Sequence, residues 1–245
     1  MNILMGLDDT DNETSRGTGL QARHLGEAIQ ENSLAKLLAV TRHQLLVDPR
    51  IDYTSRNSSA CLVLDASEND IGDLLEFSRS ELSARCAPDS NAGLAIAEAS
   101  VVDRAVQELG QKAKHRVLSA EDAQAITQTK GISLEVVLGS GIGVIGALAA
   151  LGLHKSGDDG RFIWLPELRD LDGSYTVGEL SRLLGVEITT ASGMKLPLGA
   201  DIDSVDWMRP ILQEGRAILL AEKEIVDGEI RWHLTDKPTV KALSD

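Results

Sequence analysis

The alternation of apolar and polar positions divides the first part of the chain into strands and helices. An apolar run at 2–7 predicts a strand, and apolar positions at helical spacing over 19–31 predict a helix. Two more strands are expected at 37–43 and 60–65, on either side of a polar, irregular segment at 47–59. Strand and helix therefore alternate from the N-terminus onward.

The same alternation continues through the middle of the chain. A helix is expected at 68–85, opened by a capping box at 67–70 whose side chains satisfy free backbone N–H groups. A strand at 93–98 and helices at about 100–113 and 119–129 follow it.

The second half is predicted to contain shorter elements of the same two kinds. These are a strand at 133–138, a glycine-rich turn at 139–143, an Ala/Leu helix at 144–153, an exposed loop at 154–160, a strand at 161–165, a short helix at 176–184 and a β-hairpin at 216–235. We find no internal repeat and no long linker. The pattern predicts a compact α/β or α+β fold, with mixed sheets and flanking helices.

The composition is that of a globular protein with its own core. The chain has 245 residues, of which 42% are hydrophobic and 3% aromatic, so Leu, Ile, Val and Ala are expected to form the core. Its two cysteines are too few for a disulfide framework or a zinc site. The N-terminus shows no signal-peptide pattern, and no apolar run is long enough to span a bilayer. We expect a soluble, cytoplasmic protein with no membrane partner.

The charge of the chain bears on its partners. The formal net charge is -14 and the pI is about 4.8. A surface of this sign repels phosphate backbones, because nucleic-acid affinity comes mainly from Lys and Arg displacing counterions. A nucleic acid could bind such a chain only at a local basic cleft. The charge therefore predicts that the chain is not a general nucleic-acid binder.

Three carboxylates follow the first strand within one turn of backbone, at Asp8, Asp9 and Asp11. Like charges within about 4–6 Å raise one another's pKa, and a divalent cation relieves this repulsion. Mg²⁺ suits oxygen ligands, keeps several waters and takes up substrate phosphates. The run therefore predicts a magnesium site, although solvated acids at a helix N-terminus would give the same sequence. A haloacid-type phosphatase is excluded, because Thr10 stands where that class needs its second Asp.

A glycine-rich segment, 139–146, lies between an expected strand and an expected helix. Small residues let backbone N–H groups reach a phosphate, and a helix N-terminus favours its charge. Gly141, Gly143 and Gly146 also match the GxGxxG pattern of dinucleotide-binding folds, with Glu167 near the place of a ribose-binding acid. A close helix–strand crossing that requires glycine is the alternative explanation. The chain has no Walker A motif.

Two polar segments are further candidates for phosphate binding. Segment 48–57 places Arg56 and Asn57 just ahead of an expected buried strand, where an Arg can clamp phosphate through two hydrogen bonds. An ordinary surface turn with a solvated Arg explains it equally well. Segment 90–93 (SNAG) is a weaker candidate, because a plain Asn/Gly turn is the simpler interpretation.

Four of these segments together resemble one family, TiaS, the archaeal tRNA-isoleucine agmatinylcytidine synthetase. Residues 6–11 (GLDDTD) are similar to its GIDDTD signature, and 48–56 (DPRIDYTSR) to its NPxIPYKTRGN stretch. Residues 90–93 resemble its TNPG turn, and 141–152 (GIGVIGALAALG) resemble its GRGLIGALAAIG segment. The matches follow the family's order and span roughly residues 3 to 153.

The resemblance implies an ATP-dependent, kinase-like domain over 1–153 that binds nucleotide and metal, with 154–245 as a C-terminal α/β extension packed on it. In the family, this domain phosphorylates a cytosine carbonyl before agmatine attacks. Carried over by position, this implies a catalytic role for Asp9 and Arg56, and Mg²⁺ ligation by Asp8, Asp9 and Asp11. The residues expected to bind ATP are Arg16, Thr18, Asn57, Asn91, Gly93, Gly141, Gly143 and Gly146.

The chain also departs from the family pattern. The family's Cys-Thr-Thr, with its phosphorylated threonine, has no clear counterpart after Arg16 and Gly17, and Thr18 is offset from it by two residues. Ile142 replaces the arginine of the GRG segment, and no OB-fold or zinc-ribbon sequence follows. Because those modules hold the tRNA and the chain is acidic, we do not expect tRNA as a partner.

The sequence therefore predicts an ATP- and Mg²⁺-dependent kinase- or ligase-like enzyme that acts on a small molecule. A homo-oligomeric assembly is compatible with this prediction. Two alternatives stay open. A non-catalytic nucleotide sensor would explain the missing threonine and arginine, and an NAD-binding oxidoreductase would use the glycine turn and Glu167.

Overall fold

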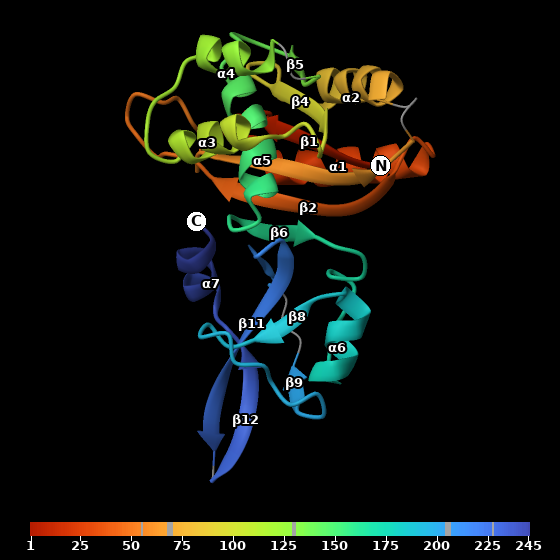
Figure 1. Ribbon diagram of the computed structural model, residues 1–245, viewed down its shortest axis with the longest axis vertical. Helices are drawn as coiled ribbons and strands as arrows, with labels where there is room; N and C mark the ends of the chain where they lie inside the picture. Colours follow the sequence, from red (N-terminus) through yellow and green to blue (C-terminus); the bar gives the residue numbers. More distant parts are fainter. Residues whose placement is uncertain (55, 68–70, 129–130, 204–206, 227) are drawn as a thin grey trace. The chain divides into compact units, whose positions relative to one another are not determined.

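The computed structural model describes residues 1–54, 56–67, 71–128, 131–203, 207–226 and 228–245. The chain forms two compact units, Met1–Ser156 and Gly157–Asp245 (Figure 1). The capping box expected at 67–70 includes residues that lie outside the described part of the chain.

The first unit is built on a sheet whose described strands have the order β5-β4-β1-β3-β2, with every neighbouring pair antiparallel. The strands are β1 (Asn2–Asp8), β2 (Lys36–Gln44), β3 (Ser58–Asp65), β4 (Gly93–Glu98) and β5 (Ser133–Val136). The helices are α1 (Thr18–Glu31), α2 (Ile71–Arg85), α3 (Arg104–Ala113), α4 (Ala120–Thr127) and α5 (Gly143–Ser156). The expected mixture of strands and flanking helices is confirmed.

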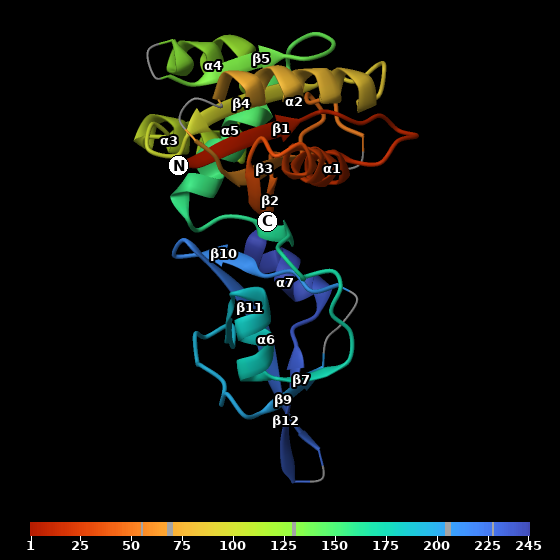
Figure 2. The same cartoon turned by 90° about the vertical axis from the view of Figure 1, so that its right-hand side faces the viewer.

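The central strand β1 is covered on both faces, which explains why its residues are apolar at consecutive positions. Leu4 belongs to a buried cluster with residues of α3 and α5. The next residue, Met5, faces α2, where Ser78 Oγ lies 3.5 Å from Met5 Sδ. Successive side chains of a strand point to opposite faces, so helices cover both sides of the sheet. Figure 2 shows α5 and α1 on either side of β3.

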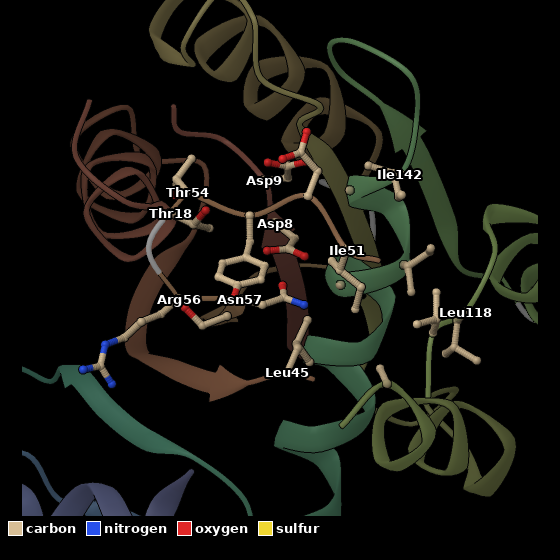
Figure 3. Close-up of a pocket in the computed structure, with 18 of the residues that line it drawn as sticks. Asp8, Asp9, Thr18, Leu45, Ile51, Thr54, Arg56, Asn57, Leu118 and Ile142 are labelled. Carbon is tan, nitrogen blue, oxygen red and sulfur yellow. The ribbon is translucent and has the colours of Figure 1, made fainter. Parts of the chain in front are cut away.

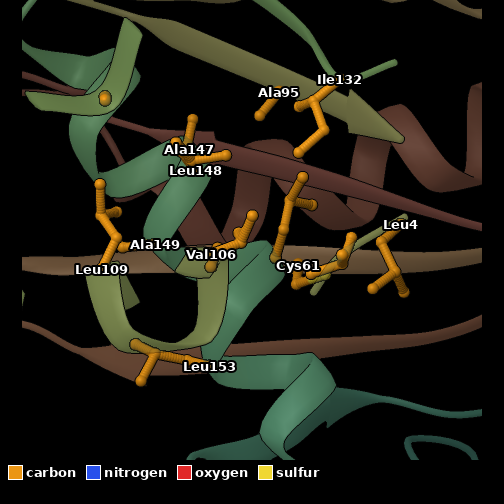
Figure 4. Close-up of a cluster of buried hydrophobic side chains, with 14 of the residues drawn as sticks. Leu4, Cys61, Ala95, Val106, Leu109, Ile132, Ala147, Leu148, Ala149 and Leu153 are labelled. Atoms are coloured by element: carbon orange, nitrogen blue, oxygen red, sulfur yellow. The ribbon is translucent and has the colours of Figure 1, made fainter. Parts of the chain in front are cut away.

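Glycines bring α5 directly onto the sheet. A Cβ added to Gly6 of β1 would lie 1.9 Å from the carbonyl oxygen of Ala147. One added to Gly93 of β4 would lie 2.2 Å from the carbonyl carbon of Gly143. The core between α3, α5 and the sheet consists of aliphatic side chains and alanines, as the composition predicts, together with Cys61 (Figure 4). Close backbone packing therefore replaces the bulk that aromatic side chains would supply.

The helix α5 continues beyond the point expected from the sequence. An exposed loop is predicted from 154, but α5 runs to Ser156. The reason is His154, whose Nδ1 lies 3.0 Å from Thr41 Oγ1. The same hydroxyl lies 2.9 Å from Nε2 of His43, which is fully buried. The prediction of a loop at this position is wrong, because a histidine that hydrogen-bonds inside a core has the sequence signature of an exposed one.

The described residues of the second unit form short strands, one long hairpin and two helices. Strands β6 (Arg161–Trp164), β10 (Ile211–Gln213), β11 (Arg216–Val226) and β12 (Glu229–Leu234) form successive antiparallel pairs. β8 (Glu187–Thr189) pairs with β11, and β7 (Ser174–Thr176) and β9 (Asp201–Asp203) extend the sheet beside β12. The helices are α6 (Val177–Leu184) and α7 (Lys237–Ser244).

The hairpin β11–β12 and the helix α6 confirm the sequence prediction for this unit. The strands β7, β8, β9 and β10 were not expected, because three residues each are too few to establish a period of two. Helix α7 was also missed, although Asp236 caps it by accepting a hydrogen bond from Thr239 N. None of the described helices is both long and apolar enough to cross a membrane.

Gly6→Ala is expected to destabilise the first unit by about 3 kcal/mol, because its methyl group would overlap the backbone of α5 and push the helix off the sheet. Gly72→Ala in α2 is the matched control. Nothing lies within 4 Å of its Cβ position, so alanine should stabilise the helix by up to about 1 kcal/mol. Urea denaturation measures both changes, and a Gly6→Ala protein as stable as wild type would contradict the close contact.

Acid is expected to destabilise the first unit through His154. Burial first, and then the nearby charges of His43 and Lys155, lower the pKa of His154 from 6.5 to about 3. As the pH falls between these values, the unfolded chain binds a proton that the folded chain does not bind. This group therefore lowers the unfolding free energy by up to about 1.4 kcal/mol per pH unit. His154→Gln does not titrate, so its urea midpoint should depend less on pH, and equal slopes for the two proteins would disprove the assignment.

Candidate functional site

A pocket opens in the first unit where β1 ends, beside the first turn of α5 (Figure 3). It is an open pocket, and its volume of about 760 Å³ includes the solvent at its mouth. Its lining residues fall within four parts of the sequence, 8–18, 45–58, 113–118 and 142–146. The fold therefore brings the acidic run, the polar segment and the glycine turn to one place.

Three kinds of side chain line this pocket. The carboxylates are Asp8, Asp9, Asp11 and Asp52, the larger aliphatic side chains are Leu45, Ile51, Val117, Leu118, Ile142 and Ile145, and the cations are Arg50, Arg56 and Arg116. In Figure 3, Leu118 and Ile142 lie on one side of Asp8, and Arg56 lies on the other. An apolar wall with a few placed polar groups is typical of small-molecule and cofactor sites.

Asp8 ends β1, and its carboxyl group lies against the first turn of α5. A Cβ added to Gly146 would lie 1.7 Å from Asp8 Oδ2, so a side chain at 146 would displace the carboxyl group. Burial is the main cause that raises the pKa of Asp8 from 3.8 to about 8, and the charge of Asp9 raises it further. Carboxyl groups with pKa values shifted in this way are frequent at functional sites.

Asp9 has a φ of 54°, in the left-handed region that residues with side chains seldom adopt. Burial raises the pKa of Asp9, a hydrogen bond from the Asn91 side chain opposes this, and the charges of Asp11 and Asp52 raise it again. Backbone conformations of this kind concentrate at active sites and ligand clamps.

Asp11 is engaged in holding the walls of the pocket together. Its Oδ1 accepts hydrogen bonds from Thr18 N at 3.2 Å and Thr18 Oγ1 at 3.0 Å, at the start of α1. Its Oδ2 accepts a hydrogen bond of 2.6 Å from Thr54 Oγ1, in the segment between β2 and β3. Both oxygens of Asp11 are therefore used within the protein.

Within the described part of the chain, no three His, Cys, Asp or Glu side chains are placed to share one metal ion. The magnesium site at Asp8, Asp9 and Asp11 therefore stays a prediction. Mg²⁺ is usually bound through one or two carboxylates, and substrate phosphates and waters complete its coordination. Asp8 and Asp9 fit this requirement best, because crowding and burial raise the pKa values of both.

The pocket gathers most of the predicted site residues and leaves others outside. Of these residues, Asp8, Asp9, Asp11, Thr18, Arg56, Asn57, Gly143 and Gly146 line it. Asn91 lines a neighbouring pocket, whereas Arg16, Gly93 and Gly141 line neither of the two. The packing of Gly93 against α5 gives this glycine a structural role.

Arg56 and Asn57 take positions that their sequence context does not reveal. The guanidinium group of Arg56 points away from Asp8 and Asp9 in Figure 3. The Asn57 side chain donates a hydrogen bond of 2.8 Å from Nδ2 to the carbonyl oxygen of Leu46, so it also fixes the connection between β2 and β3.

The sequence interpretation missed the apolar wall and Arg116. Val117 and Ile142 are 40% and 43% exposed, so both present apolar surface at the pocket. An apolar residue inside a turn, such as Ile142 in the glycine-rich segment, is the signal that was available. Arg50 also lines the pocket, but it is paired with Asp48 at 2.8 Å.

A second pocket, of about 870 Å³ with open solvent included, lies beside the first and shares Asp9, Asp11, Asp52, Tyr53 and Thr54 with it. Its charged lining residues are all acids: Asp9, Asp11, Glu13, Asp52 and Asp89. The local potential of this pocket is therefore negative, and it favours cations.

The dinucleotide-binding alternative does not fit the fold. Every described strand pair of the first unit is antiparallel, whereas that class of site needs parallel βαβ units. The match of the glycine segment to GxGxxG is therefore explained by the packing of α5.

Comparison with known proteins finds that the structure of the chain is similar to several solved structures. No family model and no curated protein matches the sequence. Among solved structures, apo TiaS, a tRNA agmatidine synthetase, matches with a TM-score of 0.54 and 23% identity, over 62% of this chain and 35% of the TiaS chain. The complex of TiaS with its tRNA and ATP matches with a TM-score of 0.55 and 24% identity, over 62% and 36%. The complex of TiaS with its tRNA, AMPCPP and agmatine matches with a TM-score of 0.53 and 23% identity, over the same shares.

These matches define the class: the chain is a mixed α/β protein with the fold of one part of TiaS. At this identity the similarity establishes the fold alone. The chain spans about a third of the length of the TiaS chains that it matches.

The prediction that tRNA is not a partner is wrong. TiaS chains with this fold form complexes with tRNA. The net charge of -14 is a sum over the whole chain. Exposed charges act over a Debye length of about 8–10 Å, so contact with a nucleic acid depends on local charge and not on that sum.

Asp8→Asn is expected to stabilise the protein in neutral solution. The carboxyl group of Asp8 ionises near pH 3.8 in the unfolded chain and near pH 8 in the folded chain. Between these values folding takes up a proton, so wild type loses up to about 1.4 kcal/mol of stability from this group per pH unit as the pH rises. The carboxamide of the variant does not titrate, so the difference in urea midpoint should grow with pH. Asp73→Asn, on the exposed side of α2, is the control, and an Asp8→Asn protein no more stable than wild type at alkaline pH would refute the assignment.

Proposed function

We propose that the chain is an ATP- and Mg²⁺-dependent phosphoryl-transfer enzyme, kinase- or ligase-like, whose nucleotide binds in the pocket beside Asp8. The observation that carries this proposal is the lining of that pocket, where carboxylates, an apolar wall and arginines meet. The shared fold with TiaS, which forms complexes with ATP and AMPCPP, supports it.

The parts of the lining suit the parts of a nucleoside triphosphate. Val117, Leu118 and Ile142 offer apolar surface to a nucleobase, which gains from leaving water. Arg116 can form charge-assisted hydrogen bonds with phosphate oxygens, and Arg56 can do so once its guanidinium group turns toward Asp8 and Asp9. The first turn of α5 adds the positive end of a helix dipole.

Asp8 and Asp9 are the residues that would hold Mg²⁺. When bound, the ion neutralises charge on the phosphate oxygens, and catalysis then consists mainly of positioning. Asp11 would not need to bind it, because its hydrogen bonds to Thr18 and Thr54 keep α1 and the segment between β2 and β3 in place.

The acidic second pocket suits a cationic second substrate, such as an alkylamine or a guanidine. It shares Asp9 and Asp11 with the nucleotide pocket, so the two ligands would meet at these residues. One TiaS structure contains AMPCPP and agmatine together. The group that is phosphorylated would be a carbonyl or hydroxyl, carried by a small molecule or by an RNA base.

Calorimetry of the purified chain with ATP tests the central claim, and we expect binding that requires Mg²⁺. Asp9→Asn should weaken this binding by about tenfold to a hundredfold, because a charged contact to the metal is lost. Asp73→Asn removes one negative charge outside both pockets and should leave the affinity unchanged. The absence of Mg²⁺-dependent ATP binding in wild type would sink the proposal.

A measurement of ATP turnover distinguishes between an enzyme and a non-catalytic nucleotide sensor. The chain is incubated with ATP and Mg²⁺, together with either pooled metabolites or total tRNA, and ATP consumption is followed. Consumption that Asp9→Asn abolishes supports an enzyme, and the pool that is required identifies the class of the acceptor. Binding without consumption in either pool supports the sensor.

A further inference from the structure

Part of the polar segment between β2 and β3 lies where the two pockets meet. Residues 50–54 line the first pocket, and residues 52–54 line the second pocket as well. Asp9 and Asp11 also line both. We call residues 50–54 the shared wall, because their position decides where the first pocket ends and the second begins.

A side-chain hydrogen bond joins the shared wall to the acidic run. Thr54 Oγ1 donates to Asp11 Oδ2 at 2.6 Å, a length typical of a hydroxyl that donates to an ionised carboxylate. Among the described residues, 49–54 form no other hydrogen bond or ion pair with a distant part of the chain, because their remaining bonds are accepted by Asp48. The position of the shared wall therefore depends strongly on this one bond.

The acceptor of this bond is itself held in place. Asp11 Oδ1 accepts hydrogen bonds from Thr18 N at 3.2 Å and Thr18 Oγ1 at 3.0 Å, at the start of α1. The Thr18 hydroxyl accepts a hydrogen bond of 3.2 Å from Thr10 Oγ1, and Thr10 is fully buried. In Figure 3, Thr54 lies beside Thr18. Thr54 is therefore bonded to a carboxylate that is anchored in the interior of the first unit.

The charges around this bond oppose it. Asp9, Asp11 and Asp52 all line both pockets, so three carboxylates meet at the shared wall. Like charges repel one another, and this repulsion pushes Asp52 and the rest of the wall away from the acidic run. The hydrogen bond from Thr54 acts against the repulsion. Its loss is therefore expected to let the wall move outward.

We infer that Thr54 is a positioning residue, which through Asp11 holds residues 50–54 as the shared wall of the two pockets. This inference rests on the proposed function, in which the first pocket takes the nucleotide. Ile51 belongs to the wall and offers apolar surface to that pocket. An outward movement of the wall would remove this surface from the nucleotide, so the nucleotide would bind less tightly.

Thr54→Val tests the inference, because it removes the hydroxyl and keeps the size of an exposed side chain. Calorimetry should show that Mg²⁺–ATP binds about fivefold less tightly, the effect of losing one hydrogen bond of ordinary strength. Thr54→Ser keeps the hydroxyl and should bind Mg²⁺–ATP as wild type does. Thr127→Val, in α4 and in the lining of neither pocket, is the matched control. Wild-type affinity in Thr54→Val would overturn the inference.

Trypsin provides a measurement that needs no ligand. It cleaves after arginine, and the side chain of Arg50 is 71% exposed. Opening of the shared wall should make cleavage between Arg50 and Ile51 about fivefold faster in Thr54→Val, because proteolysis follows the population of the open form. Thr54→Ser and Thr127→Val should be cleaved there at the wild-type rate. Cleavage after Arg79, within α2, reports unfolding of the whole unit and should not change.

The protease result separates this inference from the proposed function. If wild type does not bind Mg²⁺–ATP but cleavage after Arg50 is faster in Thr54→Val, the proposed function fails and the role of Thr54 in holding the wall stands. Unchanged cleavage after Arg50 would show that the bond does not hold the wall. An equal increase after Arg50 and Arg79 would show a general loss of stability. Either of these two results overturns the inference, whatever the chain binds.

Discussion

The first unit depends on the close approach of α5 to the sheet. Gly6 and Gly93 leave no room for a side chain between the helix backbone and the strands β1 and β4. This approach places the first turn of α5 beside Asp8 and so forms one wall of the pocket. It also buries the Asp8 carboxyl group, which is the main cause of its raised pKa. The shape of the pocket and its unusual charge state therefore have one structural origin.

Charge is distributed unevenly around the pocket, and this limits the ligands that fit. Asp11 is satisfied by Thr18 and Thr54, whereas crowding and burial make ionisation unfavourable for Asp8 and Asp9. A cation at these two residues would lower the free energy of the ionised site. An anion alone would raise it, because it would add a further negative charge. A metal–nucleotide complex carries both charges in one ligand, which is why it complements this lining better than a free phosphate does.

The sequence predicts the first unit well because its signals there are local. The apolar period identifies β1 to β4 and α5, and Asp8 and Asp9 are visible as a run directly after the first strand. The apolar wall could not be predicted, because Leu45, Val117 and Ile145 become neighbours only after the sheet has formed and α3 and α5 have packed on it. The short strands of the second unit offer too few positions to show a period. A sequence pattern therefore locates the polar residues of a site, such as Asp8 and Asp9, more readily than the apolar surface around them.

The glycine-rich segment has two physical explanations, and the structure separates them. A Cβ at Gly93, Gly143 or Gly146 would collide with the backbone of a neighbouring segment or with Asp8, so packing alone requires these glycines. Their presence therefore does not count in favour of a bound phosphate. Asp9 is different, because its left-handed conformation and its crowded charge both destabilise the folded chain. Strain and charge of this kind are typical of residues that bind ligands, which makes Asp9 stronger evidence for a functional site than the glycines.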